Sequence, residues 1–174
     1  MEYTFTLKYQ LAVDDCNHED LVERLGEAGC DDATLGIGQP GRIALAFTRD
    51  SADAWTAIFT ALQDIKQAIP SARLIEAAPD FVGLTDAADV TGMSRQNMRK
   101  LMLAHATDFP APVHEGNPSL WHLSDILAWL DDREGYSISA DLFEIASSAK
   151  QVNLAKEARE REPRASRELE GLIA

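Results

Sequence analysis

A chain of 174 residues, 45% of them apolar, is long enough for one large domain or two small ones and too apolar for general disorder. Its formal net charge of -13 excludes a non-specific nucleic-acid coat, because phosphate neutralisation needs an excess of Lys and Arg, so any DNA binding is confined to one face or assembled from several copies. No apolar run reaches the ~20 residues of a membrane helix, no signal peptide is visible, and two cysteines without CxxC spacing, Cys16 and Cys30, predict free thiols in a reducing cytoplasm.

The first predicted elements are a strand, a helix and a hairpin. Residues 3–13 alternate apolar with mostly polar side chains, which predicts a strand with one buried face. Asn17 is a suitable N-cap for a helix that ends at Gly29, where a left-handed conformation is available. Residues 33–37 and 43–47 alternate on either side of "GQPG" and predict two strands joined by a tight turn.

A longer helix is predicted from about Ser51, and Pro70 ends it. Its expected apolar stripe comprises Trp55, Ile58, Phe59, Leu62, Ile65 and Ile69. A short strand over residues 72–77 completes the order strand-helix-strand-strand-helix-strand, which belongs to the ferredoxin-like plan. We therefore expect an α+β domain over residues 1–78 that serves oligomerisation or sensing. The carboxylates that flank its strands and turns are interpreted as solubilising charge: Asp14, Asp15, Asp31 and Asp32.

Residues 81–135 predict a second, α-rich domain after "AAPD", which we interpret as a linker at residues 77–80. Thr85 is the expected N-cap of a short helix through Val90, Gly92 breaks that helix, and Ser94 caps the next one. The prolines of "DFPAPV" stop the second helix. Residues 113–122 predict a tight hairpin around "EGNPS", and another helix starts at residue 123 or 124. We expect Trp121 and Trp129 in the core of this domain.

The stretch "GMSRQNMRKLM", residues 92–102, gathers three cations in six positions of an acidic chain. On a helix its apolar side chains share one face and are expected to bury against the preceding helix and turn: Met98, Leu101 and Met102 against Leu84, Ala88, Val90 and Met93.

The polar side chains of this helix suit a DNA groove. Arg95, Gln96 and Arg99 share the other face, where Arg can fork onto guanine and Gln can pair with adenine. Lys100 and the helix N-terminus suit phosphates. The alternative for the two arginines is a solvated face that pairs with Asp86 or Asp89.

"LTDAADVTGMSRQNMRKLM", followed by "DFPAPVHEGNPSLWHLSDILAWL", resembles the MerR-like winged helix-turn-helix, especially its excisionase and AlpA-like branch. The resemblance covers residues 81–131 and lies in Ala88, the "G-x-S-R" turn at residues 92–95, the pair Phe109–Pro110, the strand ending at Trp121, and "LSDILAWL".

This resemblance implies which residues contact DNA. Ser94, Arg95, Gln96 and Arg99 stand where family members touch bases and phosphates, and Asn97 and Lys100 lie beside them as further DNA-binding candidates. Residues 114–117 correspond to the wing along the neighbouring backbone, with His114 and Asn117 as its donors.

Two residues depart from the family pattern. Glu115 stands at the wing tip where the family carries cations, and Thr91 replaces an apolar residue before the turn. Each missing wing cation removes roughly one phosphate contact, so a monomer should bind weakly and a dimer or larger homo-oligomer is expected.

A C-terminal helix is predicted over residues 138–160, with an apolar seam of Leu142, Ile145, Ala149 and Val152. Two apolar heptads are too few for a coiled coil, so this helix is expected to pack on its own domain or on a protein partner. Residues 161–174 are charged and interrupted by Pro163, which predicts a flexible tail, either disordered or loosely helical.

The sequence therefore predicts a sequence-specific transcriptional regulator that binds double-stranded DNA. Its histidines lack ligand spacing and no catalytic signature occurs, so we expect no metal, no cofactor and no enzymatic activity. Two alternatives remain open. One is an antitoxin-like protein that neutralises a partner, to which the C-terminal helix and tail would bind, and represses its own operon. The other is a regulator that senses a small molecule through the N-terminal domain.

Overall fold

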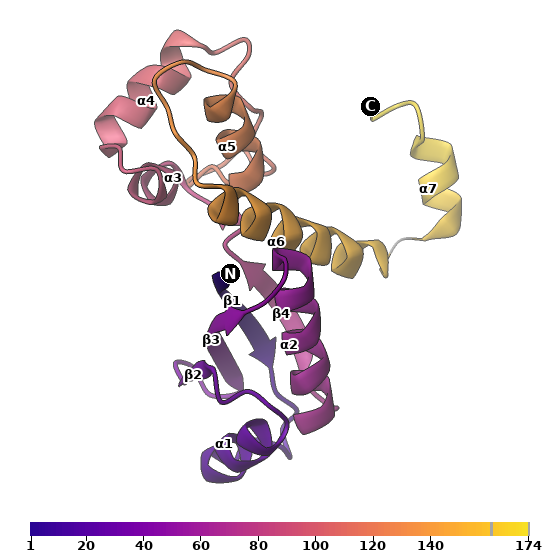
Figure 1. Cartoon of the computed structure of the whole chain (residues 1–174). Helices are drawn as coiled ribbons and strands as arrows, with labels where there is room; N and C mark the ends of the chain where they lie inside the picture. Colours follow the sequence, from indigo (N-terminus) through magenta and orange to yellow (C-terminus); the bar gives the residue numbers. More distant parts are fainter. Residues whose placement is uncertain (161, 174) are drawn as a thin grey trace.

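The computed structural model describes residues 1–160 and 162–173 and confirms a mixed α+β fold. Its first part comprises β1 (Glu2–Gln10), α1 (His18–Glu27), β2 (Ala33–Gly36), β3 (Arg42–Asp50), α2 (Ala54–Ala68) and β4 (Arg73–Ala78). Its second part comprises β5 (Phe81–Val82), α3 (Leu84–Val90), α4 (Arg95–Ala104), β6 (Trp121–His122), α5 (Leu123–Asp131), α6 (Ala140–Ala158) and α7 (Pro163–Leu169). In Figure 1 the sheet with α1 and α2 lies at one end, α3 to α5 lie at the other, and α6 runs between them.

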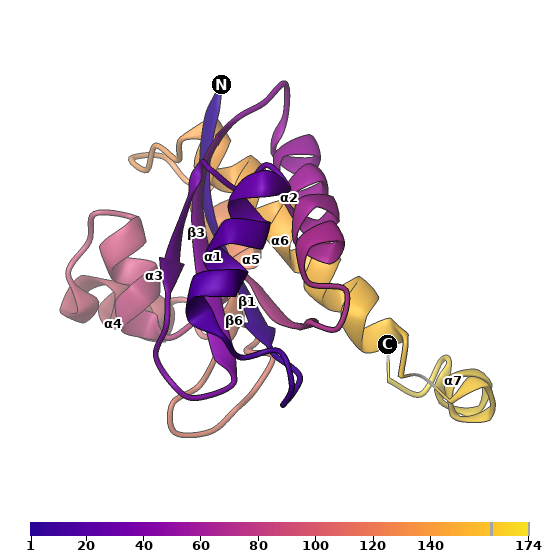
Figure 2. The same cartoon turned by 90° about the horizontal axis from the view of Figure 1, so that it is seen from below.

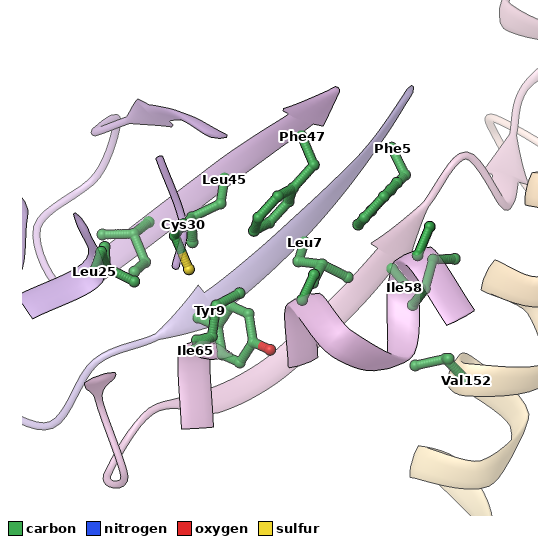
Figure 3. Packing of buried hydrophobic residues seen from close by; sticks show 14 of the residues in the cluster. Phe5, Leu7, Tyr9, Leu25, Cys30, Leu45, Phe47, Ile58, Ile65 and Val152 are labelled. Atoms are coloured by element: carbon green, nitrogen blue, oxygen red, sulfur yellow. The ribbon is translucent and has the colours of Figure 1, made fainter. Parts of the chain in front are cut away.

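The first part is an antiparallel sheet with the strand order β2-β3-β1-β4. Alternate side chains of β1 are buried, as period-two patterning predicts, and they meet those of β3. Phe5 stacks on Phe47 with ring centroids 5.1 Å apart (Figure 3). Both α1 and α2 cover this face (Figure 2), and their buried residues, including Leu25 and Ile65, belong to the same core.

The two helices begin at side-chain caps. Asn17 accepts hydrogen bonds from the first turn of α1, as predicted, and Gly29 adopts a φ of 98° just beyond its end. Helix α2 begins at Ala54, slightly later than the predicted start at about Ser51, and its cap Asp53 accepts a hydrogen bond from Thr56 N.

The predicted stripe of α2 is partly wrong. Ile58, Ile65 and Ile69 are buried as expected, but Trp55 is 49% exposed and Phe59 is 46% exposed. Alanines take their place against the core: Ala54, Ala57, Ala61 and Ala68. Their small side chains let the helix lie close to the sheet, so the aromatic side chains fall on its outer face.

Two of the carboxylates interpreted as solubilising charge are structural. Arg49, on β3, is 9% exposed, and its guanidinium donates to Asp32 at 2.6 and 3.0 Å and to Asp64 at 2.9 Å. Asp15 pairs with Arg24, which lowers the pKa of the Asp15 carboxyl. Because a buried guanidinium needs carboxylate partners, these acids organise the fold.

The predicted linker at residues 77–80 is a buried junction. Asp80 is 1% exposed, and its carboxylate hydrogen-bonds His122 Nδ1 and Asn153 Nδ2, each at 2.7 Å. Leu123 N donates to Asp80 O at 2.7 Å, and β5, directly after it, pairs with β6. The two parts are thus joined by buried polar contacts and not by a free tether.

The expected packing of the C-terminal helix on its own chain is confirmed. On α6, Ile145, Ala149 and Val152 belong to the core of the sheet, whereas Ala146 and Leu142 pack in the core of the second part. Part of the predicted flexible tail is helical in α7, where Glu162 caps the helix and Pro163 opens it. Residues 161 and 174 of that tail lie outside the described residues. In the described ranges, no helix combines the length and apolar character needed to cross a bilayer.

Candidate nucleic-acid interface

The turn between α3 and α4 is fixed by backbone hydrogen bonds. Met93 N donates to Ala88 O at 2.8 Å and Gly92 N donates to Asp89 O at 3.2 Å, which is the pattern of a Schellman motif. Gly92 has a φ of 69°, a conformation that side-chain-bearing residues rarely adopt. Thr91 donates its hydroxyl to Ala87 O at 2.7 Å, so its polar side chain is satisfied at the end of α3.

The N-cap predicted from the sequence is confirmed for α4 but not for α3. Ser94 is the N-cap of α4 as predicted, and its Oγ accepts a hydrogen bond from Asn97 N at 3.1 Å. The predicted N-cap of α3 is wrong. Thr85 lies inside the helix, Gly83 is the cap residue, and Asp86 accepts a hydrogen bond from Gly83 N at 3.0 Å.

The inner face of α4 packs closely on α3. Met98 is fully buried, and so are Ala87 and Ala88, whose small side chains allow this close approach. Leu101 is half-buried against the same core. Val90, which was expected in this contact, is instead 41% exposed because it lies on the outer side of α3.

The outer face of α4 carries the candidate side chains. All five are exposed: Arg95, Gln96, Asn97, Arg99 and Lys100. Within residues 1–160 and 162–173, the guanidinium and ammonium groups of Arg95, Arg99 and Lys100 form no hydrogen bond or ion pair. The alternative of pairing with Asp86 or Asp89 is therefore not observed.

Several cations elsewhere in the chain are occupied. Lys150 pairs with Asp125 at 2.6 Å, Lys8 pairs with Glu76 at 3.2 Å, and Arg49 is held by two aspartates. In the second part, Arg133 lies 3.4 Å from the Trp129 ring centroid and pairs with Asp108. The unpaired cations of α4 are therefore available to an external anion.

An aromatic cluster supports the segment behind α4. Phe109 meets Trp121 edge-on at 6.2 Å and Trp129 at 5.0 Å. Trp121 Nε1 donates to Pro110 O at 2.9 Å. Both tryptophans are buried, as predicted for core residues, and they anchor the chain before the exposed loop.

The predicted hairpin at residues 113–122 is smaller than expected. Leu120 N donates to His114 O at 3.0 Å, and this pair is the isolated bridge that closes the loop. Trp121 and His122 pair instead with β5. A Cβ at Gly116 would lie 2.3 Å from His114 Nε2, so a side chain at this position would require the exposed imidazole of His114 to move.

The candidate residues thus fall in two groups. Residues 94–100 share the first turns of α4, whereas His114 and Asn117 are exposed in the loop before β6. No hydrogen bond or ion pair joins the two groups in the part of the chain that the structure describes. Together they offer a helix N-terminus, three unpaired cations and three side-chain amides to a polyanion.

Sequence reasoning missed the buried contacts that hold this region on the sheet. Asp80, His122 and Asn153 come from three segments and carry no local signature. In the described residues, no group of three or more His, Cys, Asp or Glu side chains could hold a metal ion. No protein-family model, curated protein or solved structure matches this chain.

Proposed function

We propose that this protein is a sequence-specific DNA-binding regulator that inserts α4 into the major groove and binds as a dimer or larger homo-oligomer. The observation that carries the proposal is the exposed face of α4, whose three cations have no partner among the described residues. A helix-turn-helix recognition helix presents its N-terminal residues to base edges, and here these are Arg95, Gln96 and Arg99.

The topology supports the same proposal. The helix pair α3–α4, a loop closed by a bridge, and α5 are arranged in the order of a winged helix-turn-helix of the MerR-like, AlpA-related type. The sheet order β2-β3-β1-β4 with two helices on one face supports our proposal of a ferredoxin-like domain, to which we assign assembly or sensing.

Each polar residue of α4 has a distinct role in this mode. Arg95 and Arg99 fork onto guanine edges, and Gln96 pairs with adenine. Lys100 and the N-terminus of α4, capped by Ser94, contact phosphates. In the wing, His114 and Asn117 contribute weaker backbone contacts, because Glu115 between them repels phosphate.

A labelled-duplex binding assay at low salt, with the DNA upstream of the protein's own gene, tests the proposal. We expect Arg95→Ala with Arg99→Ala to lose most specific binding, since each bidentate contact contributes roughly 1–3 kcal/mol. Lys100→Ala should weaken binding to all sequences and reduce the slope of log K against log salt by about 0.9 per protomer.

A matched control separates a located interface from general electrostatics. Arg42 and Arg73, on β3 and β4, are exposed arginines without an ion-pair partner among the described residues. Replacing both by Ala changes the net charge by the same amount, and we expect little loss of specific binding. Equal losses in the two double variants, or full binding by the α4 variant, would refute the role of α4.

A second candidate function, small-molecule sensing, is supported by a cavity of about 660 Å³ where α2, β4 and the end of α6 meet. The cavity is of the size that small ligands occupy. Tyr9 lines it, is 5% exposed, and its hydroxyl has no hydrogen-bond partner in the described ranges. Both basic and acidic side chains line it, among them Lys66, Arg159, Glu157 and Glu160.

Thermal-shift measurements with benzoate, phenyl phosphate and benzylammonium test this second function. An anion that occupies the cavity should raise the melting temperature of the parent and of Arg42→Gln, but not of Arg159→Gln with Tyr9→Phe. Equal shifts of the melting temperature in all three proteins, or no shift with any probe, would refute ligand binding in this cavity.

A further inference from the structure

The outer face of α2 bears a seam of large apolar side chains, namely Trp55, Phe59 and Leu62. Trp55 and Phe59 are about half-exposed and stack on each other, with ring centroids 6.2 Å apart and planes at 19°. Leu62, half-buried, follows one turn later, and Lys66 comes after it. Steps of four, three and four residues are those of a helix that packs along one partner helix.

This face is almost free of charge in a strongly acidic chain. Asp64 and Lys66 are the charged residues of α2, and Asp64 accepts a hydrogen bond from the buried Arg49 at 2.9 Å. Depletion of charge together with exposed aromatic side chains is typical of the core of a protein interface. Two copies of an acidic chain can approach along such a face without direct repulsion.

We propose that this seam pairs with the same seam of a second copy of the chain, with the two α2 helices antiparallel about a two-fold axis near Phe59. The face is self-complementary in this arrangement, as an isologous dimer requires. Trp55 and Lys66 lie about 6 Å and 10.5 Å from Phe59 along the helix, on opposite sides, and both are on the seam face. The axis therefore brings the Lys66 of each copy close to Trp55 of the other, where a cation–π contact can form.

This inference deepens the proposed function by naming the surface that makes the protein a dimer. A two-fold dimer presents two copies of α4 and so supplies the second half-site contact that a weak monomer needs. The seam itself can be tested without DNA, so its failure is distinguishable from failure of the α4 proposal.

Sedimentation velocity of the full chain, from about 1 to about 100 µM, measures the association directly. We expect a concentration-dependent dimer. Trp55→Gln with Phe59→Gln should give a folded monomer, because both side chains lie outside the core. Val22→Gln serves as the control, since Val22 is an apolar residue of α1 that is 54% exposed and lies outside the seam. A parent that stays monomeric, or a dimer that survives the double substitution, overturns the proposal.

Cysteine cross-linking tests the antiparallel geometry. In a Cys16→Ser background, Phe59→Cys should form an intermolecular disulfide under mild oxidation, because the two Cβ atoms meet at the axis. Lys66→Cys should not, since the two positions lie about 21 Å apart along the helix axes. Cross-linking of both variants would indicate a parallel pair, and cross-linking of neither would exclude this face as the contact; either result overturns the proposed arrangement.

Discussion

Asn153 holds the two parts of the molecule together, and its removal should be severe. It lies on α6, is 1% exposed, and makes three hydrogen bonds to the junction. Its Oδ1 accepts from Ala77 N at 2.9 Å, and its Nδ2 donates to Ala77 O at 2.8 Å and to Asp80 Oδ2 at 2.7 Å. His122 supplies the other contact of the Asp80 carboxylate.

The cost of Asn153→Ala follows from the groups that it leaves without partners. An amide N–H, a carbonyl and one carboxylate oxygen remain in a buried site, and each unsatisfied group costs about 1–3 kcal/mol. Because the cavity can admit some water, we expect a loss of about 3–5 kcal/mol in the free energy of unfolding. For a chain of this length, that loss corresponds to a melting temperature lower by about 6–20 °C.

Denaturant unfolding followed by circular dichroism, with calorimetry, measures this effect. Gln151→Ala is the matched control, because Gln151 is an exposed amide on the same helix and should change stability by less than ~0.5 kcal/mol. The parent should unfold in one transition, since α6 contributes to both cores. If Asn153→Ala unfolds within about 1 kcal/mol of the parent, the junction is not held by this side chain.

Three further predictions concern local features. Gly92→Ala should destabilise by about 1 kcal/mol in calorimetry because its φ is 69°, whereas Gly38→Ala, at an open position, should not. Burial raises the pKa of Cys30 to about 11, so at pH 8 a thiol reagent should label the half-buried Cys16 first and Cys30 only upon unfolding; equal labelling rates would contradict this. Arg49→Leu leaves two partly buried carboxylates unpaired and should cost about 3–5 kcal/mol in denaturant unfolding, an estimate that a change below 1 kcal/mol would reject.

Local patterns predicted the elements well where one physical rule dominates. Period-two alternation placed β1 and its buried face, because side chains of a strand point alternately to its two sides. Gly92 and Ser94 located the turn before α4, since a positive φ and a helix cap each need particular residues.

Patterning failed where two faces of one helix are apolar. On α2, Trp55 and Phe59 were expected inside, but the alanines of the opposite side face the sheet. Hydrophobicity alone does not distinguish a wide aromatic face from a narrow alanine face. The distance between helix and sheet decides between them, and that distance is a tertiary property.

Polar contacts between segments that are distant in the chain could not be predicted from local sequence patterns. The "AAPD" stretch has the composition of a linker. Its Asp80 nevertheless hydrogen-bonds His122 and Asn153, which lie 42 and 73 positions later in the chain. The hairpin at residues 113–122 is likewise shorter than its sequence predicts, because Trp121 and His122 pair with residues 81–82 and not across the loop. Such pairings depend on which segments meet, so no local spacing encodes them.

The distribution of charge reconciles an acidic chain with a polyanionic ligand. Residues 92–107 hold three cations and no carboxylate, so the remaining residues carry more negative charge than the net -13 of the whole chain. In Figure 1, α4 lies at the opposite end of the molecule from α1 and its acidic first turn. Phosphates bound against α4 would lie close to its cations. At physiological salt the Debye length is about 8 Å, so the more distant acidic residues of the sheet are largely screened from those phosphates. In the proposed mode, repulsion from the distant acids therefore slows association at low salt, whereas contact affinity falls as salt rises.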